Sequence, residues 1–535
     1  MAQMGSWHGE QCLEVTGRRF VALAGEVHNS TSSDEAAMEA AWQKAHELGI
    51  ATLVVPVTWE LLEPEEGVFN FSQADSLIAQ ARTHGGHLVF LWFGTWKNAQ
   101  GFYAPEWVKR DQKRFWRAEP LRGQRQIETE RYHATYGTFS ALSDETAAAD
   151  ARAFAALMRH LRELDGTAQT VVAVQVENEC GLMCAAREHS ELADRLFAQE
   201  EVPEALLGAL KAHLEELPDD VRAVAAKAQA GSWEEAFGSN AAADELFQAW
   251  HTARFIEKVA SAGRKEYALP LLANCWLDKG KPAGSYPSGG PVARMMPVWK
   301  AAAPSIDIIC PDIYVRSFCD VCDSYHTEAN LLSIVETATH SYLAPRAIWA
   351  ICHHHAPIFA PFGFEEMGEP FTATQGFLFG MDVSDPALQT PQDPVRYRQT
   401  LELLQELVDM QTACDLGGSR LDAVIAERGT EQALPFGQAL LKSTFTGGVP
   451  GAVAVLDLGG DTAEGTAEAL ILAYEVRLSF ASADGKRPYA EVLKFEEGRC
   501  PEGVWQRGRR LNGDELQILS CTEPTLLKVR VLLFS

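Results

Sequence analysis

The sequence predicts an α/β protein, a (β/α)8 TIM barrel with a helical insertion after strand four and a small C-terminal all-β domain. Three observations predict it. Eight short apolar or β-branched runs alternate with helical patterns, which is the signature of a parallel barrel. A long helical stretch follows the fourth run, and only short alternating runs occupy the end of the chain. We place the barrel at residues 1–425 and the β-domain, expected to be sandwich-like, at residues 426–535.

The eight predicted barrel strands share one pattern, an apolar run that ends in polar or aromatic residues. They are Phe20–Gly25, Thr52–Thr58, His87–Phe93, Thr170–Val176, Leu269–Ala273, Ile306–Cys310, Leu331–Val335 and Pro357–Ala360. The first is followed by a helix over 34–48 whose apolar residues fall on one face. Ser32 and Glu35 form its predicted capping box, and Gly49 ends it.

Later elements are predicted from the same signals. The insertion runs from Glu188 to Tyr267 and is helical, with an amphipathic stretch over 246–262. The last barrel helix opens with Asp393 as N-cap and Pro394 in its first turn.

The C-terminal region has strand patterns instead. Its predicted strands are Gln438–Ser443, Ala452–Leu458, Ala469–Ala481, Ala490–Glu496, Glu515–Ser520 and Thr525–Phe534. Asn512-Gly513 is a hairpin-turn signal.

Composition excludes several classes of function. The 535 residues are 47% hydrophobic, which is typical of a globular protein, and carry a net charge of −27. That charge disfavours nucleic acid and anionic membranes as partners. No apolar stretch approaches the ~20 residues needed to span a bilayer, and Met1–Phe20 lacks a signal-peptide pattern. Eleven scattered cysteines fit a reducing compartment, so we expect a cytoplasmic protein and leave its oligomeric state open.

The candidate site lies where the barrel strands end, because TIM-barrel active sites form at the C-terminal face. Carboxylates, amides and aromatic rings gather there, and these are the groups that act on and bind sugars. Glu179 and Glu336 end strands four and seven, which face each other across the barrel mouth. A retaining glycosidase needs two carboxyl groups ~5–5.5 Å apart, and this pair is placed to provide them.

The segment Gln175–Gly181 resembles the Q-V-E-N-E-x-G motif of glycoside hydrolase family 35, the β-galactosidases. Five other regions are similar to the same family or to a microbial branch of it: 25–30, 59–67, 92–98, 286–291 and 509–515. The resemblance implies that Glu179 is the acid/base, that Asn178 binds the sugar 2-hydroxyl and that Glu336 is the nucleophile. Thr337-Ala338 stands where many members have an aromatic pair, so the assignment of Glu336 as nucleophile rests on the strand order and the family branch. The alternative candidates for the nucleophile are Glu328, Glu365 and Glu366.

The remaining predicted site residues are those expected to contact the substrate. With Asn178 they are Glu26, His28, Trp59, Glu60, Trp92, Asn274, Tyr314 and His340. Tyr314 matches an aromatic residue that orients the nucleophile in related barrels. Glu177 is equally compatible with binding sugar hydroxyls and with pairing to a basic group below the site.

We therefore expect a retaining exo-glycosidase that releases terminal β-linked galactose, with no cofactor and no metal. The run His353-His354-His355 does not suggest a metal site, because consecutive side chains diverge on a helix or strand. Three alternatives stay open: a β-glucosidase or β-mannosidase with the same chemistry, a metal-dependent sugar-converting barrel, and a sugar-binding protein without catalysis.

Overall fold

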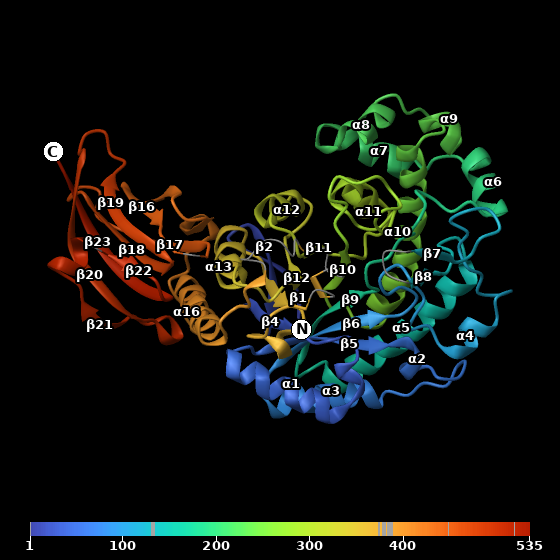
Figure 1. The fold of residues 1–535 in the computed structure, drawn as a ribbon, viewed down its shortest axis with the longest axis horizontal. Coiled ribbons are helices and arrows are strands. Elements are labelled where there is room, and N and C mark those ends of the chain that lie inside the picture. Colours follow the sequence, from blue (N-terminus) through green and yellow to red (C-terminus); the bar gives the residue numbers. More distant parts are fainter. Residues whose placement is uncertain are drawn as a thin grey trace.

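The computed structural model describes residues 2–129, 134–372, 375–376, 381, 389–447, 449–517 and 519–535. It consists of a closed barrel with a β-domain beside it (Figure 1). Within these ranges, no helix combines the length and the apolar character needed to cross a membrane.

All eight predicted barrel strands are present and form a closed parallel barrel. In chain order they are β4 (Ala22–Glu26), β5 (Thr52–Thr58), β6 (His87–Phe93), β9 (Val171–Val176), β10 (Leu271–Cys275), β11 (Ile308–Ile313), β12 (Ile334–Thr337) and β13 (Ile358–Pro361). Strand β13 pairs with β4 and closes the ring. The strands are buried almost throughout because side chains fill the barrel inside and helices cover it outside, which explains their continuous apolar sequences.

The helices around the barrel are α1 (Glu35–Leu48), α2 (Trp59–Leu62), α3 (Ser72–Thr83), α4 (Glu106–Arg110), α5 (Asp144–Asp165), α11 (Met296–Ala302), α12 (Phe318–Tyr325), α13 (Leu343–His353) and α16 (Pro394–Ala413). Asp393 caps α16 as predicted. The predicted capping box of α1 is wrong: its N-cap is Asp34, which accepts the backbone N–H of Ala37, and Ser32 lies in a preceding 3-10 turn. Gly49 ends α1 in a left-handed conformation, as expected.

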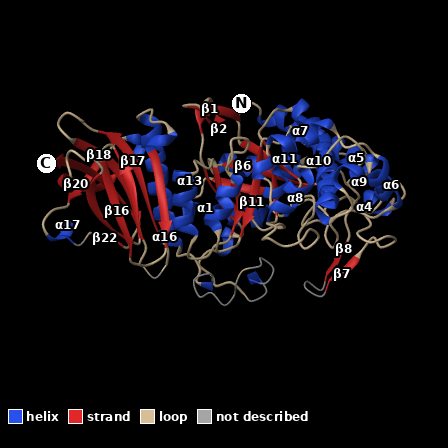
Figure 2. Ribbon diagram, turned by 90° about the horizontal axis from the view of Figure 1, so that it is seen from above, coloured by secondary structure: helices blue, strands red, loops and turns tan. Residues whose placement is uncertain are grey.

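The predicted insertion is helical. It comprises α6 (Glu191–Gln199), α7 (Glu204–Ala212), α8 (Asp219–Ala225), α9 (Trp233–Phe237) and α10 (Ala241–Glu266). Figures 1 and 2 show these helices on the side of the barrel away from the β-domain. A short hairpin, β7 (Ile127–Thr129) with β8 (Ala134–Tyr136), projects from the same side (Figure 2).

An N-terminal antiparallel sheet was not predicted. It consists of β1 (Gln3–Trp7), β2 (Glu10–Val15) and β3 (Arg18–Arg19). The backbone N–H of Thr16 bonds with Gln169, just before β9, so the sheet lies at the N-terminal end of the barrel. Its strands are too short and too polar to give a clear pattern in the sequence.

The C-terminal domain is all-β, as predicted, with two sheets. The six-stranded sheet has the order β14 (Leu421–Ala426), β17 (Gly451–Gly459), β18 (Thr466–Tyr474), β23 (Thr525–Phe534), β20 (Tyr489–Arg499), β21 (Gln506–Arg510). The other has the order β15 (Glu431–Phe436), β16 (Ala439–Phe445), β19 (Val476–Ser482), β22 (Ser520–Cys521).

Three details of this domain differ from expectation. The run 469–481 forms two strands, because Glu475 between them has a positive φ of 53°. The run 515–520 contains a short helix, α17 (Asp514–Gln517), so Asn512-Gly513 leads into a helix and not into a hairpin. The six-stranded sheet already begins with β14, at Leu421, a few residues before the position at which we divided the chain.

Strands β17 and β18 of the six-stranded sheet are buried on both faces, whereas the edge strand β21 is exposed. Along β17, Val453 and Val455 face the core between the two sheets, whereas Ala452, Ala454 and Leu456 belong to the core shared with the barrel. Strand β17 is therefore apolar at nearly every position, because alternate side chains enter different cores.

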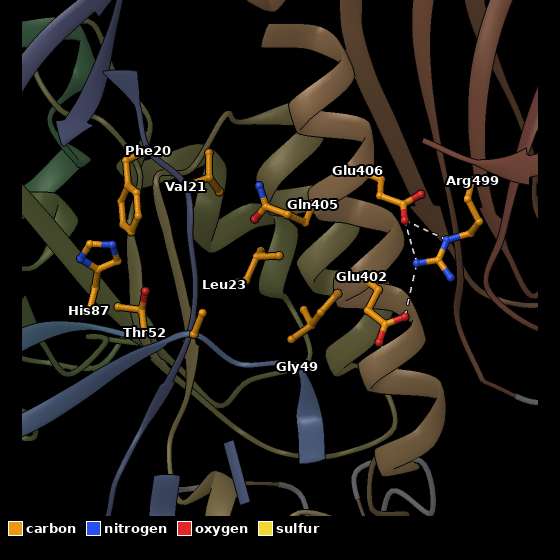
Figure 3. A pocket seen from close by; sticks show the side chains of 12 residues that line it. Phe20, Val21, Leu23, Gly49, Thr52, His87, Glu402, Gln405, Glu406 and Arg499 are labelled. Atoms are coloured by element: carbon orange, nitrogen blue, oxygen red, sulfur yellow. Dashed lines mark hydrogen bonds and ion pairs between the residues drawn. The ribbon is translucent and has the colours of Figure 1, made fainter. Parts of the chain in front are cut away.

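A cavity of about 360 Å³ lies where the barrel meets α16 (Figure 3). Residues at or before the starts of three barrel strands line it, including Leu23, Thr52 and His87. Arg499 from β20 pairs with Glu406 and Glu402 of α16 at its edge. Because the strands start here, this cavity is at the opposite end of the barrel from the predicted site.

Candidate active site

Three carboxylates meet at the C-terminal ends of the barrel strands. Glu179 follows β9, Asp312 lies in β11 and Glu336 lies in β12, and all three side chains are buried. One carboxylate oxygen from each lies within 4.8 Å of the other two. The structure thus brings together Glu179 and Glu336, the pair that the sequence singled out.

Neighbouring residues fix these carboxylates. Tyr314 donates its hydroxyl to Oε1 of Glu336 at 2.5 Å. Asn274 accepts the backbone N–H of Glu179 at 3.0 Å and donates its amide to Asp312 at 2.7 Å. Both residues occupy the positions near the acids that the sequence predicted for them.

The electrostatics of the cluster favour the protonated form of Glu179. Burial, and then the charge of Glu336, raise the pKa of Glu179 to about 8. Burial and Glu336 also raise the pKa of Asp312, which is hydrogen-bonded to the carboxyl group of Glu179. Glu179 can therefore carry a proton at neutral pH, as a general acid must.

Two predicted substrate-binding groups have unused polar atoms. Among the described residues, neither amide atom of the Asn178 side chain has a hydrogen-bond partner, although Asn178 is only 1% exposed. The same holds, within the described ranges, for Oε2 of Glu26. Buried polar groups are normally paired, so these atoms are available to hydroxyl groups of a ligand.

The backbone around the acids is held in an unusual conformation. Glu177 and Glu179 have φ values of 63° and 48°, and Asn98 and Ala99 in the facing loop have values of 52° and 56°. The two segments are joined by a hydrogen bond from the N–H of Ala99 to the carbonyl of Glu179. Positive φ values in non-glycine residues cost energy and concentrate at functional sites.

Among the residues that the structure describes, Glu177 has no basic partner, in contrast to one of the two interpretations of the sequence. It is fully buried, accepts the N–H of Trp96 at 2.7 Å and is hydrogen-bonded to Asp150. Burial, followed by the charge of Asp150, raises its pKa. Glu177 and Asp150 thus form a buried acid pair directly below the site.

Three predicted substrate-binding residues are fully buried and hydrogen-bonded to other protein groups. Trp92 is fully buried and donates its indole N–H to Asp150 at 2.8 Å, and Trp59 likewise donates to Glu63 at 2.8 Å. His340 is fully buried with Nε2 3.1 Å from Arg346, while its Nδ1 accepts the N–H of Tyr342. Their hydrogen-bonding groups already have partners within the protein, so these side chains pack in the interior.

Two further predicted residues follow barrel strands, His28 in the loop after β4 and Glu60 in α2 after β5. His28 is half-buried and packs edge-on against Phe362 at 5.1 Å, and Glu60 faces Lys109 at 3.8 Å. Of the fallback nucleophiles, Glu365 accepts the backbone N–H of His28, Glu366 lies 3.6 Å from the ring of His28, and Glu328 is exposed after α12.

The predicted set of site residues omitted Asp312 and Lys97. Asp312 does end a predicted strand, but only the structure shows it bound to Glu179. Lys97 is 6% exposed, with Nζ 5.0 Å from the ring centroid of Phe93, and its charge lowers the pKa of both Glu26 and Glu179. Its signal in the sequence is a lysine within an aromatic segment that directly follows a barrel strand.

Glu179, Asp312 and Glu336 are also close enough to hold a cation. One oxygen of Glu336 and one of Asp312 already accept hydrogen bonds from Tyr314 and Asn274. Hydrogen bonds from neighbouring side chains therefore already hold two of the three acids in place.

Two family models match the chain. Residues 28–200 match the model Glyco_hydro_42, described as β-galactosidase, and residues 404–521 match a domain of unknown function, DUF5597. The first match supports a glycoside hydrolase and indicates family 42, and not family 35, the family that the sequence motifs had suggested. A comparison with curated proteins gives no match.

The solved structures that match the chain include three glycosidases. The β-galactosidase from Marinomonas ef1 is 14% identical, with a TM-score of 0.45, over 74% of this chain and 61% of that one. Gan42B, a GH42 β-galactosidase from G. stearothermophilus, is 11% identical, with a TM-score of 0.45, over 95% and 98%. The exo-β-1,4-mannosidase Op5Man5 from Opitutaceae bacterium strain TAV5 is 13% identical, with a TM-score of 0.41, over 72% and 60%. The chain covers about six tenths of the Marinomonas enzyme.

Proposed function

We propose that this protein is a retaining exo-glycosidase that hydrolyses terminal β-D-galactosyl residues, with Glu179 as acid/base and Glu336 as nucleophile. The observation that carries the proposal is the approach of their carboxylate oxygens to within 4.8 Å at the barrel mouth. Oxygens this close allow the ~5–5.5 Å separation of carboxyl groups that retention needs, whereas inversion needs groups ~6.5–9.5 Å apart to admit a water molecule.

In the first step, Glu336 attacks the anomeric carbon and the glycosidic C–O bond breaks. Oε1 of Glu336 is held by Tyr314, while its buried Oε2 has no hydrogen-bond partner among the described residues and is the oxygen available for attack. Glu179 gives its proton to the leaving oxygen, and a glycosyl-enzyme ester remains.

In the second step, Glu179 has become a carboxylate and takes a proton from water. The water oxygen attacks the anomeric carbon, and the bond to Glu336 breaks, so the product keeps the β configuration. Asp312 is hydrogen-bonded to Glu179 and keeps it oriented in both steps. Asn178 and Glu26 offer unused polar atoms to the sugar hydroxyls.

The description of the matched family supports galactose as the sugar. Side-by-side assays of nitrophenyl β-galactoside, β-glucoside and β-mannoside should show the highest kcat/KM for galactoside. NMR of the first product formed should show the β-anomer. A preference for another sugar would change the substrate, whereas an α-anomer would overturn the mechanism.

The metal-dependent alternative rests on the same three carboxylates, since they could hold a cation. Activity that is unchanged after exhaustive chelation would remove this alternative. Activity that is lost on chelation and restored by a divalent ion would favour it over the two-glutamate mechanism.

A further inference from the structure

A second cluster of possible ligands lies far from the acids, where α12 and α13 meet the first strand of the β-domain. One ring nitrogen each from His353 and His354 and one carboxylate oxygen of Asp323 lie within 4.8 Å of one another. The sequence did not suggest this, because consecutive histidines diverge on a regular helix. Here α13 ends at His353, and the third group comes from the neighbouring helix α12.

His353 is oriented as metal-binding histidines usually are. Its Nδ1 lies 2.6 Å from a carboxylate oxygen of Asp422 on β14, and its ring stacks on Trp349 at 5.1 Å. Ligand histidines typically bond one ring N–H to a carboxylate, which fixes the ring and directs the other nitrogen to the metal. Nε2 is therefore the nitrogen that His353 can offer.

His354 also offers a ring nitrogen to the cluster. It is 5% exposed, and its Nδ1 lies 2.7 Å from Nδ1 of His326. Its buried Nε2 has no hydrogen-bond partner in the described part of the chain, yet it lies 3.2 Å from Oδ1 of Asp323. Zinc–ligand distances of 2.0–2.2 Å place two tetrahedral ligands about 3.3–3.6 Å apart, so a separation of 3.2 Å is close to that of two groups sharing an ion.

We propose that Asp323, His353 and His354 bind a divalent transition-metal ion such as Zn²⁺, with water completing the coordination. Two imidazoles and one carboxylate suit zinc and its neighbours in the first transition row better than Mg²⁺ or Ca²⁺, which prefer oxygen ligands. The ion would join α12 to α13 and, through Asp422, connect both to the β-domain. It would lie outside the proposed active site and act on stability.

The test is a calorimetric titration of the chelator-treated full-length protein with ZnCl2, together with its melting temperature with and without the ion. We expect one tight site per chain and a higher melting temperature with zinc. Asp323→Asn should weaken this binding at least tenfold and abolish the zinc-dependent rise. Asp320→Asn, an exposed neighbour on the same helix, is the matched control and should behave as wild type.

Two more variants identify the site. Asp422→Asn should lower the zinc affinity ~10–100-fold, as loss of a group that orients a ligand does. Glu336→Gln should bind zinc as wild type does, which separates this site from the acidic cluster. Absence of zinc binding, or equal binding by Asp323→Asn and Asp320→Asn, would overturn the proposal without affecting the proposed glycosidase.

Discussion

Replacing Asn178 with alanine should separate catalysis from stability. Among the described residues, the Asn178 side chain makes no hydrogen bond, and the bond from its backbone N–H to the carbonyl of Trp96 is kept in alanine. Each unpaired buried polar atom costs ~1–3 kcal/mol, so its removal offsets the lost packing. We expect Asn178→Ala to melt at or slightly above the wild-type temperature.

The same change should greatly reduce activity. A bond to the 2-hydroxyl that strengthens in the transition state is comparable to one oxyanion-hole donor, whose loss costs ~10²–10³-fold in kcat. We expect kcat/KM for an aryl β-galactoside to fall by this factor. On the matching 2-deoxy substrate, the wild-type enzyme and Asn178→Ala should have nearly equal kcat/KM, because neither can form the hydrogen bond to a 2-hydroxyl.

Calorimetry and steady-state kinetics on both substrates measure these effects. Our reasoning would be refuted if Asn178→Ala melted far below wild type, or if both substrates lost the same factor. Either result would mean that the side chain supports the fold and does not bind the 2-hydroxyl.

Three further predictions concern pH, packing and the domain interface. Glu179 must be protonated to act as the acid and its pKa is raised to about 8, so kcat/KM should fall as pH rises through that value. The Glu179→Gln variant should lose this alkaline limb of the pH profile. An alkaline limb that persists in the variant would exclude the acid role of Glu179. Trp92→Phe removes a hydrogen-bond donor from buried Asp150 and should lower the free energy of unfolding by ~1–3 kcal/mol in denaturant titrations. A large rise in KM at unchanged stability would show instead that Trp92 contacts the substrate. Arg499→Ala breaks a half-exposed ion pair with Glu406, so it should lower the free energy of unfolding by no more than ~1 kcal/mol and leave kcat/KM unchanged. A strong loss of activity would show that the β-domain contributes to the active site.

The barrel could be predicted from the sequence because its strands have a strong and simple pattern. Each of the eight is an apolar run that ends in a polar or aromatic residue, and strand order alone placed Glu179 opposite Glu336. The short β1–β3 sheet lacks such a pattern. The break at Glu475 was hidden because the residues on both sides of it are apolar.

The site was harder to predict because a residue's position at a strand end does not fix the direction of its side chain. Trp92 and Tyr314 both end barrel strands, yet Trp92 bonds with Asp150 beneath the site and Tyr314 bonds with Glu336 within it. Asp312 carries no motif of its own, and its importance follows from its bond to Glu179. These distinctions depend on contacts between residues far apart in the sequence.

The most direct test of the two-glutamate mechanism is to trap its covalent intermediate in Glu179→Gln. With a dinitrophenyl β-galactoside, whose leaving group needs no proton, the first step should proceed while the second lacks its base. Mass spectrometry of the intact protein and of its peptides should then show a galactosyl ester on Glu336, and azide should release it as β-galactosyl azide. An ester on another carboxylate, or no ester together with an α-azide product, would contradict the mechanism.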